Sequence, residues 1–297
     1  MNKANSSSAQ IRDSPVQIIL ITGATSGIGK ETALALARDG AHVIVHGRDK
    51  LKTLATQQQI KEETKNNNVD VLIADLSSLD DVLKAAAQIN KSYPRIDILI
   101  NNAGLMTGAK RQLSIDGFEL TFATNHLAHF LLTALLLEKL KKSKAARIIN
   151  VSSKVHSGGK FDSTNLQLES GYSPMKAYSN SKLYNILFTQ ELARRLEKNK
   201  LNIIVNCLHP GVVATNFGNN AGGAMNAMLT VIRPFMISAR DGAKTTLYLA
   251  RDETAGKING KYFDKEQETA TSNSAINEAN AKELWEISEK LTGVKFL

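Results

Sequence analysis

The chain has 297 residues, 42% of them hydrophobic and 22% charged, so it can bury a sizeable core and is not disordered by composition. The net charge is +9, but the lysines and arginines are spread in short groups, which argues against nucleic-acid binding and favours affinity for anionic ligands. The single cysteine, Cys207, excludes an intrachain disulfide.

Residues 1–15 are polar and rich in serine and asparagine, and they are predicted to form a disordered leader. They lack the apolar centre of a signal peptide. No run of about 18 apolar residues is evident elsewhere, so we expect no transmembrane segment and a soluble, cytoplasmic protein.

Short apolar runs rich in β-branched residues alternate with helical patterns over residues 16–297. Continuously apolar strands are typical of a parallel sheet covered on both faces. The pattern predicts an α/β fold, a doubly wound Rossmann sheet of about seven parallel strands in a single domain. Its strands are expected at 16–22, 41–47, 69–75, 95–101, 146–152, 201–208 and 257–263, and helices at 28–39, 118–141, 178–198 and 239–251.

The first strand ends in a glycine-rich stretch, TGATSGIGKETA, at residues 22–33. Glycines allow a tight turn and close approach to a pyrophosphate, and the following helix offers free N–H groups. The alternative is a turn that only joins strand to helix. We expect cofactor contacts from Gly23, Thr25, Ser26, Gly27, Ile28 and Gly29.

The second strand is followed by Arg48 and then Asp49. An arginine here accommodates the 2′-phosphate of NADP, whereas an acidic residue binds the ribose hydroxyl of NAD. Lys30, beside Gly29, is expected to add positive charge. NADP(H) is therefore preferred over NAD(H), and the alternative is that Arg48 is a solvated turn residue and Asp49 binds the ribose.

Polar residues also follow the third and fourth strands, where a doubly wound sheet binds its ligand. Asp75 and Leu76 follow the third strand, and an asparagine-rich turn that includes Asn102, Ala103 and Gly104 follows the fourth. These residues are candidate cofactor contacts. The alternatives are a helix cap for Asp75 and an ordinary turn for the asparagines.

Two tyrosine–lysine pairs have the same spacing, Tyr172 with Lys176 and Tyr178 with Lys182. Pro174 disfavours helix around the first pair, whereas the second pair lies in an uninterrupted helical pattern that brings its side chains one turn apart. A cation beside a phenol lowers the phenol pKa and suits it to proton transfer. A serine after the fifth strand, Ser152 or Ser153, would hydrogen-bond the substrate oxygen.

Five segments together resemble the classical short-chain dehydrogenase/reductase family, in its retinol-dehydrogenase-like branch. They are TGATSGIG, NNAG, NVSS, YSNSK and HPGVVAT, in the family's order. Further pieces of that branch are TNHLAHFLLT, LFTQELARRL, GKYF and LWEISEKLTG. The resemblance covers residues 16 to about 297.

The resemblance implies a role for each matching residue. Tyr178 is the expected acid/base, Lys182 the lysine that lowers its pKa and binds the nicotinamide ribose, and Ser153, rather than Ser152, the oxyanion-side hydroxyl. Asn125 is expected to hold a water of the proton relay. The segment expected to bind the nicotinamide carboxamide contains Pro210, Gly211, Val213 and Thr215, and the adenine side contains Asp75, Asn101, Ala103 and Gly104.

Three features bear on substrate and assembly. No hydrophobic anchor of the membrane-bound retinol dehydrogenases is seen, and residues 216–238 form a substrate loop whose glycines and methionines suit a mobile apolar lid. The amphipathic C-terminal extension, 275–292, contains Trp285, which is expected to pack near the cleft or a subunit partner. The family's dimers make a homodimer the expected assembly, unless this extension blocks the interface.

The sequence therefore predicts an NADP(H)-dependent oxidoreductase that interconverts a small apolar aldehyde or ketone and its alcohol. His126 and His129 lie three apart, but no third ligand is near, so no metal is expected. The alternatives are an NAD-linked dehydrogenase of secondary alcohols or steroids, with Asp49 on the ribose, and a sensor that binds the dinucleotide without catalysis.

Overall fold

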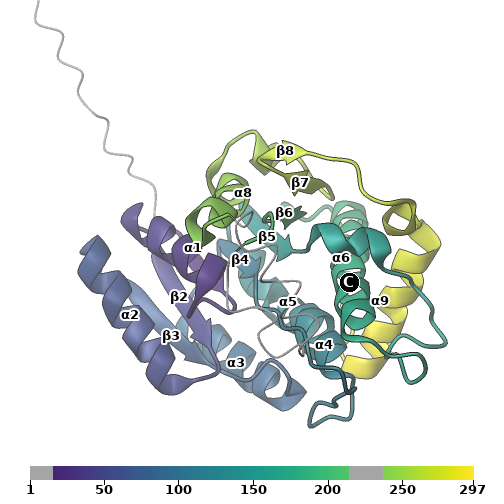
Figure 1. Ribbon diagram of the computed structural model, residues 1–297. Coiled ribbons are helices and arrows are strands. Elements are labelled where there is room, and N and C mark those ends of the chain that lie inside the picture. The colour runs from purple at the N-terminus through teal and green to yellow at the C-terminus, as the bar shows by residue number, and fades with distance from the viewer. Residues whose placement is uncertain (1–15, 214–236) are drawn as a thin grey trace, which may run out of the picture.

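The computed structural model describes residues 16–213 and 237–297, and it is built around one eight-stranded sheet (Figure 1). The strand order is β3-β2-β1-β4-β5-β6-β7-β8. Seven strands are parallel, which confirms the predicted Rossmann sheet, and β8 pairs antiparallel with β7. The strands are β1 (Ile18–Ile21), β2 (His42–Gly47), β3 (Val69–Ile73), β4 (Ile98–Asn101), β5 (Ala146–Val151), β6 (Ile203–His209), β7 (Tyr262–Asp264) and β8 (Gln267–Glu268).

Helices cover both faces of this sheet (Figure 1). One face packs against α1 (Gly27–Arg38), α2 (Lys50–Thr64) and α8 (Ala239–Arg251). The other packs against α3 (Leu79–Ser92), α5 (Ala128–Leu140) and α6 (Pro174–Lys198). Because both faces are covered, every residue of β1 and β4 is buried, which explains why these strands are continuously apolar.

The strand order reverses direction between β1 and β4, which lie side by side in the centre of the sheet. The chain leaves β1 toward β2 on one side and leaves β4 toward β5 on the other. The loops at the carboxyl ends of these two strands therefore diverge and open a crevice, the usual ligand site of a doubly wound sheet.

The helix predicted over 118–141 is divided into three segments. A short helix, α4 (Leu120–Phe122), is followed by a π-helical turn at Ala123–Leu127 and then by α5. By length and composition, Leu120–Leu140 is the one stretch within the described residues that is apolar enough to cross a membrane. However, 83% of its apolar window is buried inside the fold, where α5 packs against α3 as a core helix.

The C-terminal helix α9 (Glu278–Thr292) falls within the extension predicted at 275–292, and it packs along α6. Trp285 is buried on this helix, where it stacks on Phe296 with ring centroids 4.8 Å apart and meets Phe130 edge-on at 5.0 Å. Trp285 is therefore a core residue, which confirms the expectation that it packs.

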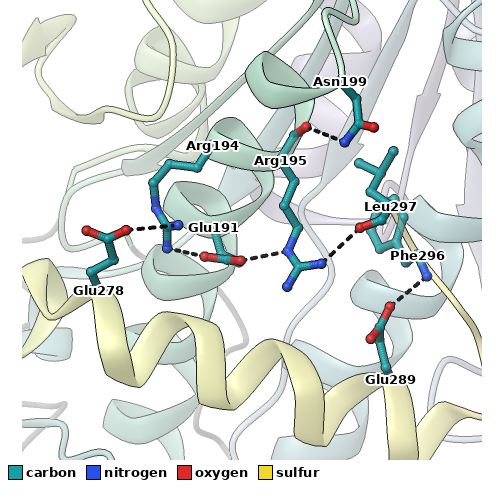
Figure 2. A network of polar contacts seen from close by, with 8 residues as sticks. All are labelled: Glu191, Arg194, Arg195, Asn199, Glu278, Glu289, Phe296 and Leu297. Carbon is teal, nitrogen blue, oxygen red and sulfur yellow. Dashed lines mark hydrogen bonds and ion pairs between the residues drawn. The ribbon is translucent and has the colours of Figure 1, made fainter.

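A network of charged side chains also holds α9 against α6 (Figure 2). Glu191 of α6 is buried and pairs with both Arg194 and Arg195 of its own helix. Arg194 also pairs with Glu278 of α9 at 3.0 Å, and the Arg195 guanidinium lies 4.4 Å from the Trp285 ring centroid. The extension thus covers one face of α6.

Candidate active site

The glycine-rich loop between β1 and α1 has the backbone that its sequence predicts. Gly23 and Gly27 have φ values of +64° and +55°, a region that favours glycine. A Cβ on Gly29 would collide with the Gly23 carbonyl and with the Asn102 amide. The loop is therefore closed tightly against the turn after β4, and the first residues of α1, Gly27 to Gly29, line the crevice.

A cavity of about 640 Å³ opens in this crevice. Its lining includes most of the contacts predicted for the phosphate loop, for Arg48 and for the loops after β3 and β4: Gly23, Thr25, Ser26, Gly27, Ile28, Gly29, Arg48, Asp75, Leu76, Asn102, Ala103 and Gly104. Residues distant in sequence thus meet at the carboxyl edge of the sheet. His46, Lys52 and the loop from Leu105 to Gly108 also line it, and the sequence reasoning missed them.

The charged residues that line the cavity near β2 differ from those predicted. Lys30 is not among the lining residues, and its ammonium donates to Gln59 Oε1 of α2 at 2.5 Å, so the structure does not bring Lys30 to the cavity wall. Asp49 caps α2, because its Oδ1 accepts from the Lys52 N–H at 2.8 Å. The lining cations are Arg48, in the bend before α2, and Lys52, in the first turn of α2.

The loop after β4 is held by the side chain of Asn102. Its Nδ2 donates to the Thr22 carbonyl at 2.8 Å and to the Gly23 carbonyl at 3.2 Å. The Thr22 hydroxyl in turn accepts from the N–H groups of Asn102 and Ala103 at 2.9 and 3.0 Å. Asn101, by contrast, faces the core, where it donates to Asn150 Oδ1 at 2.8 Å, so its side chain is not on the adenine side.

Asp75 lines the cavity after β3. Its Oδ1 accepts from both the N–H and the hydroxyl of Ser77, each at 2.9 Å. These contacts fix the carboxylate in a tight turn, and Asp75 does not cap the next helix. That cap is Ser78, which accepts from the Asp81 N–H at the start of α3.

Tyr178 and Lys182 lie on the same helix, α6, and the lysine ammonium is 5.5 Å from the tyrosine ring centroid. Lys182 is buried, and its ammonium donates to the Val151 carbonyl at 3.0 Å. Burial lowers the pKa of Lys182 to about 8, so most molecules still carry this charge at neutral pH. A Cβ on Gly104 would lie 3.3 Å from the ammonium, so the lysine adjoins the cavity wall.

Tyr178 is held opposite Ser153 at the end of β5. Burial raises the pKa of the Tyr178 phenol above its ordinary value, and a hydrogen bond with Ser153 opposes that shift. The neighbouring Ser152 is directed elsewhere, because its hydroxyl donates to the Lys182 carbonyl at 2.7 Å. The structure therefore brings Ser153, and not Ser152, to the tyrosine.

The second tyrosine–lysine pair is separated. Tyr172 precedes the helix, and its hydroxyl lies 2.5 Å from Thr107 Oγ1 and 3.3 Å from the Gly108 carbonyl. Lys176 is exposed, and its ammonium donates to the Gly171 carbonyl at 3.1 Å. Pro174 does not interrupt the helix but begins it, so the predicted start at residue 178 was four residues late.

Asn125 lies within the π-helical turn and is fully buried. Its side chain bridges two segments: Oδ1 accepts from the Leu105 N–H at 2.8 Å, and Nδ2 donates to the Leu105 carbonyl and to Ser181 Oγ, both at 3.0 Å. Its carbonyl accepts from His129 Nδ1 at 3.2 Å. The turn therefore joins the loop after β4 to the helix that carries Tyr178.

The two histidines that follow Asn125 are engaged in the protein interior. His129 Nε2 lies 3.0 Å from the Thr22 hydroxyl, and His126 Nε2 lies 2.8 Å from the Ser288 hydroxyl of α9. Burial lowers the pKa of each to about 3, so both rings are neutral. Within residues 16–213 and 237–297, no three His, Cys, Asp or Glu side chains gather as a metal site would require.

The segment expected beside the nicotinamide follows β6. Gly211 has a φ of +88°, and Val213 forms a parallel bridge with Ile237. The neighbouring Pro210 carbonyl lies close to Gly242 of α8, so the segment is anchored at both ends. Thr215, the leader at 1–15 and nearly all of the substrate loop at 216–238 lie outside the described residues.

The fold and this site together define a class of protein. A family model described as short chain dehydrogenase matches residues 17–226. The chain belongs to this family of oxidoreductases, whose Rossmann-type fold binds a nicotinamide nucleotide, and to its retinol-dehydrogenase-like branch.

The relatives support that branch. Human retinol dehydrogenase 13 is 41% identical over 95% of this chain and 86% of its own length, and human retinol dehydrogenase 12 is 41% identical over 95% and 88%. A crystal structure of an uncharacterized protein from Mycobacterium paratuberculosis superposes with a TM-score of 0.78 at 35% identity, covering 96% of this chain and 97% of that one. A short chain dehydrogenase from Escherichia coli CFT073, solved with NADPH, gives 0.67 at 30% identity, covering 84% and 97%.

Proposed function

We propose that this protein is an NADP(H)-dependent oxidoreductase that interconverts a small apolar aldehyde or ketone and its alcohol. The observation that carries the proposal is the meeting of Tyr178, Ser153 and Lys182 beside a glycine-walled cavity. Gly104 connects the cavity with the group of Tyr178, Ser153 and Lys182, because it lines the cavity and adjoins the Lys182 ammonium.

The cavity residues fit a dinucleotide. The space beside Gly23 and Gly29 leaves no room for a Cβ, so the backbone can approach a pyrophosphate closely, and the start of α1 supplies N–H groups and a positive dipole end. Asp75, Leu76 and the Asn102–Gly104 turn would hold the adenosine half. Pro210, Gly211, Val213 and Thr215 are proposed for the nicotinamide end.

The preference for NADP(H) is proposed from the two lining cations. Arg48 and Lys52 offer positive charge where a 2′-phosphate would lie, and Asp49 is engaged as the cap of α2. The Escherichia coli neighbour was solved with NADPH, which agrees with this preference. The alternative with Asp49 on the ribose is correspondingly disfavoured.

A nicotinamide cofactor bound in this cavity would supply the hydride-transfer chemistry, and the residues of this chain would supply the proton transfer. The Tyr178 hydroxyl transfers the proton to or from the substrate oxygen, and the Ser153 hydroxyl hydrogen-bonds that oxygen. Lys182, charged at neutral pH, favours the phenolate of Tyr178 and so opposes the effect of burial on the tyrosine pKa. Asn125 fixes the Leu105 loop and Ser181 around the lysine.

Cofactor binding separates the candidate functions. We expect wild-type protein to bind NADPH more tightly than NADH, measured by cofactor fluorescence, and Arg48→Ala or Lys52→Ala to weaken only NADPH, by roughly tenfold. Asp49→Asn keeps the helix cap and serves as the matched control. A loss of NADH affinity in Asp49→Asn, with no NADPH preference in wild type, would favour the NAD-linked dehydrogenase instead.

A further inference from the structure

A buried histidine that the sequence reasoning passed over lies between the phosphate loop and the end of β3. His46 is the penultimate residue of β2, is 3% exposed and lines the cavity. Its Nδ1 accepts from the Gly23 N–H at 3.1 Å, and its Nε2 lies 3.1 Å from the Ala74 carbonyl. We propose that His46 is a positioning residue that sets the cofactor-binding conformation of the glycine-rich loop.

Both ring nitrogens have a defined role. A carbonyl oxygen can only accept, so Nε2 carries the proton and donates to Ala74, and Nδ1 is the acceptor for Gly23. This assignment requires a neutral ring, and burial lowers the pKa of His46 to about 4, which keeps the ring neutral under ordinary conditions. The side chain thus bridges β1 to β3 across the end of β2.

Both the N–H and the carbonyl of Gly23 are hydrogen-bonded to side chains. His46 holds its N–H, and the Asn102 side chain donates to its carbonyl at 3.2 Å. The backbone of His46 adds a third contact, because its carbonyl accepts from the Ala24 N–H at 2.9 Å. Without the ring, the half-buried Gly23 N–H would lose its partner within the protein, and the loop would be free to turn it elsewhere.

The position of His46 also indicates which part of the cofactor it should affect. It precedes Arg48 by two residues, but its ring faces the loop and the end of β3. Its effect should therefore reach the pyrophosphate, which both nicotinamide cofactors share, and not the 2′-phosphate that distinguishes them. This inference rests on the proposed dinucleotide function and adds a residue that acts through the loop.

Two substitutions separate the two ring contacts. In His46→Asn the amide oxygen can occupy the place of Nδ1 and accept from Gly23, whereas in His46→Gln the amide nitrogen can occupy the place of Nε2 and donate to Ala74. Each variant loses one hydrogen bond, and because asparagine is one methylene smaller than glutamine, any loss of packing should be greater in the variant that is expected to keep its affinity. Dissociation constants for NADPH and for NADH would be measured by fluorescence on the full chain, with thermal unfolding measured alongside.

We expect His46→Asn to keep NADPH and NADH affinity within about threefold of wild type, and His46→Gln to weaken both by about tenfold. In steady-state kinetics His46→Gln should raise the KM for NADPH more than it lowers kcat, because the ring acts on the loop that binds the pyrophosphate. Equal weakening in the two variants, or none in either, would overturn the inference. Wild-type protein that binds neither cofactor would overturn the proposed function itself.

Discussion

The two tyrosine–lysine pairs have identical spacing and opposite surroundings. Tyr178 and Lys182 share α6, and their side chains meet Ser153 and the cavity wall. Tyr172 lies before the helix and ties down the Thr107 loop, while Lys176 points to solvent. A four-residue spacing brings side chains together only when both residues lie in the same helix, so the position of the helix start decides which pair can act.

The largest effect should come from the tyrosine of the first pair. Tyr178→Phe removes the hydroxyl that transfers the proton, so kcat for carbonyl reduction should fall by about 10²–10⁴-fold. NADPH affinity should remain within about threefold, as measured by fluorescence titration. Equal turnover by Tyr178→Phe and wild type would break the distinction between the pairs.

The lysines should differ in both activity and stability. Lys182→Met should lower kcat by about 10²-fold, since the phenolate loses its neighbouring cation, whereas Lys176→Met should leave kcat unchanged. Steady-state kinetics with NADPH and the best carbonyl substrate provide the measurement.

Lys182→Met should also stabilise the fold near neutral pH. The pKa of Lys182 is lowered from 10.5 to about 8, so the unfolded chain holds a proton that the folded chain lacks between these values, and the stability of wild type rises with pH there. At pH 7 the buried charge is still a cost, and Lys182→Met should raise the unfolding free energy by about 1–2 kcal/mol after the lost Val151 contact is allowed for. Urea titrations should show this gain shrink toward pH 10; a gain that is absent or grows with pH would contradict it.

Tyr172 should matter for stability and little for chemistry. Tyr172→Phe removes the hydroxyl contact with Thr107 and should lower the unfolding free energy by about 1 kcal/mol, with kcat changed less than about threefold. Thr107→Val is the matched partner for a double-mutant cycle by urea unfolding. Additive effects in that cycle would show that the two hydroxyls do not interact.

The smallest effect tests the helix start that separates the pairs. Ser173 caps α6 by accepting from the Lys176 N–H at 3.2 Å, so Ser173→Ala should cost about 1 kcal/mol of stability. Turnover should be almost unchanged, because Tyr178 lies a full turn inside the helix. A large loss of kcat would mean that the first turn of α6 positions the tyrosine more directly than its place in the fold indicates.

Local patterns predicted most of the fold. Short apolar runs gave all seven parallel strands, and the pattern is clearest in β1 and β4, whose residues are all buried. β8 was missed because its two residues, Gln267 and Glu268, are polar and exposed and have no strand pattern. The start of α6 was readable, since a serine followed by proline is typical of a helix N-terminus, but Pro174 was interpreted only as a helix breaker.

The candidate site was predictable where a motif fixes the backbone, and less so where contacts cross the sheet. The glycines of the phosphate loop line the cavity because their own turn places them there. Lys30 turns instead toward Gln59, and Lys52 reaches the cavity, because both depend on how α1 and α2 pack. The ring of His46 joins residues from β1 and β3, a relation that no local pattern contains.

The most direct test of the proposed chemistry follows the hydride itself. Wild-type protein would be incubated with NADPH deuterated at the transferable position and with apolar aldehydes and ketones from short aliphatic to retinal-like and steroid-like. Mass spectrometry should find deuterium on the carbinol carbon of at least one product alcohol, and Tyr178→Phe should form that alcohol far more slowly. Tight NADPH binding with no deuterated alcohol from any member of the panel would contradict the proposal and favour a sensor that binds the dinucleotide without catalysis.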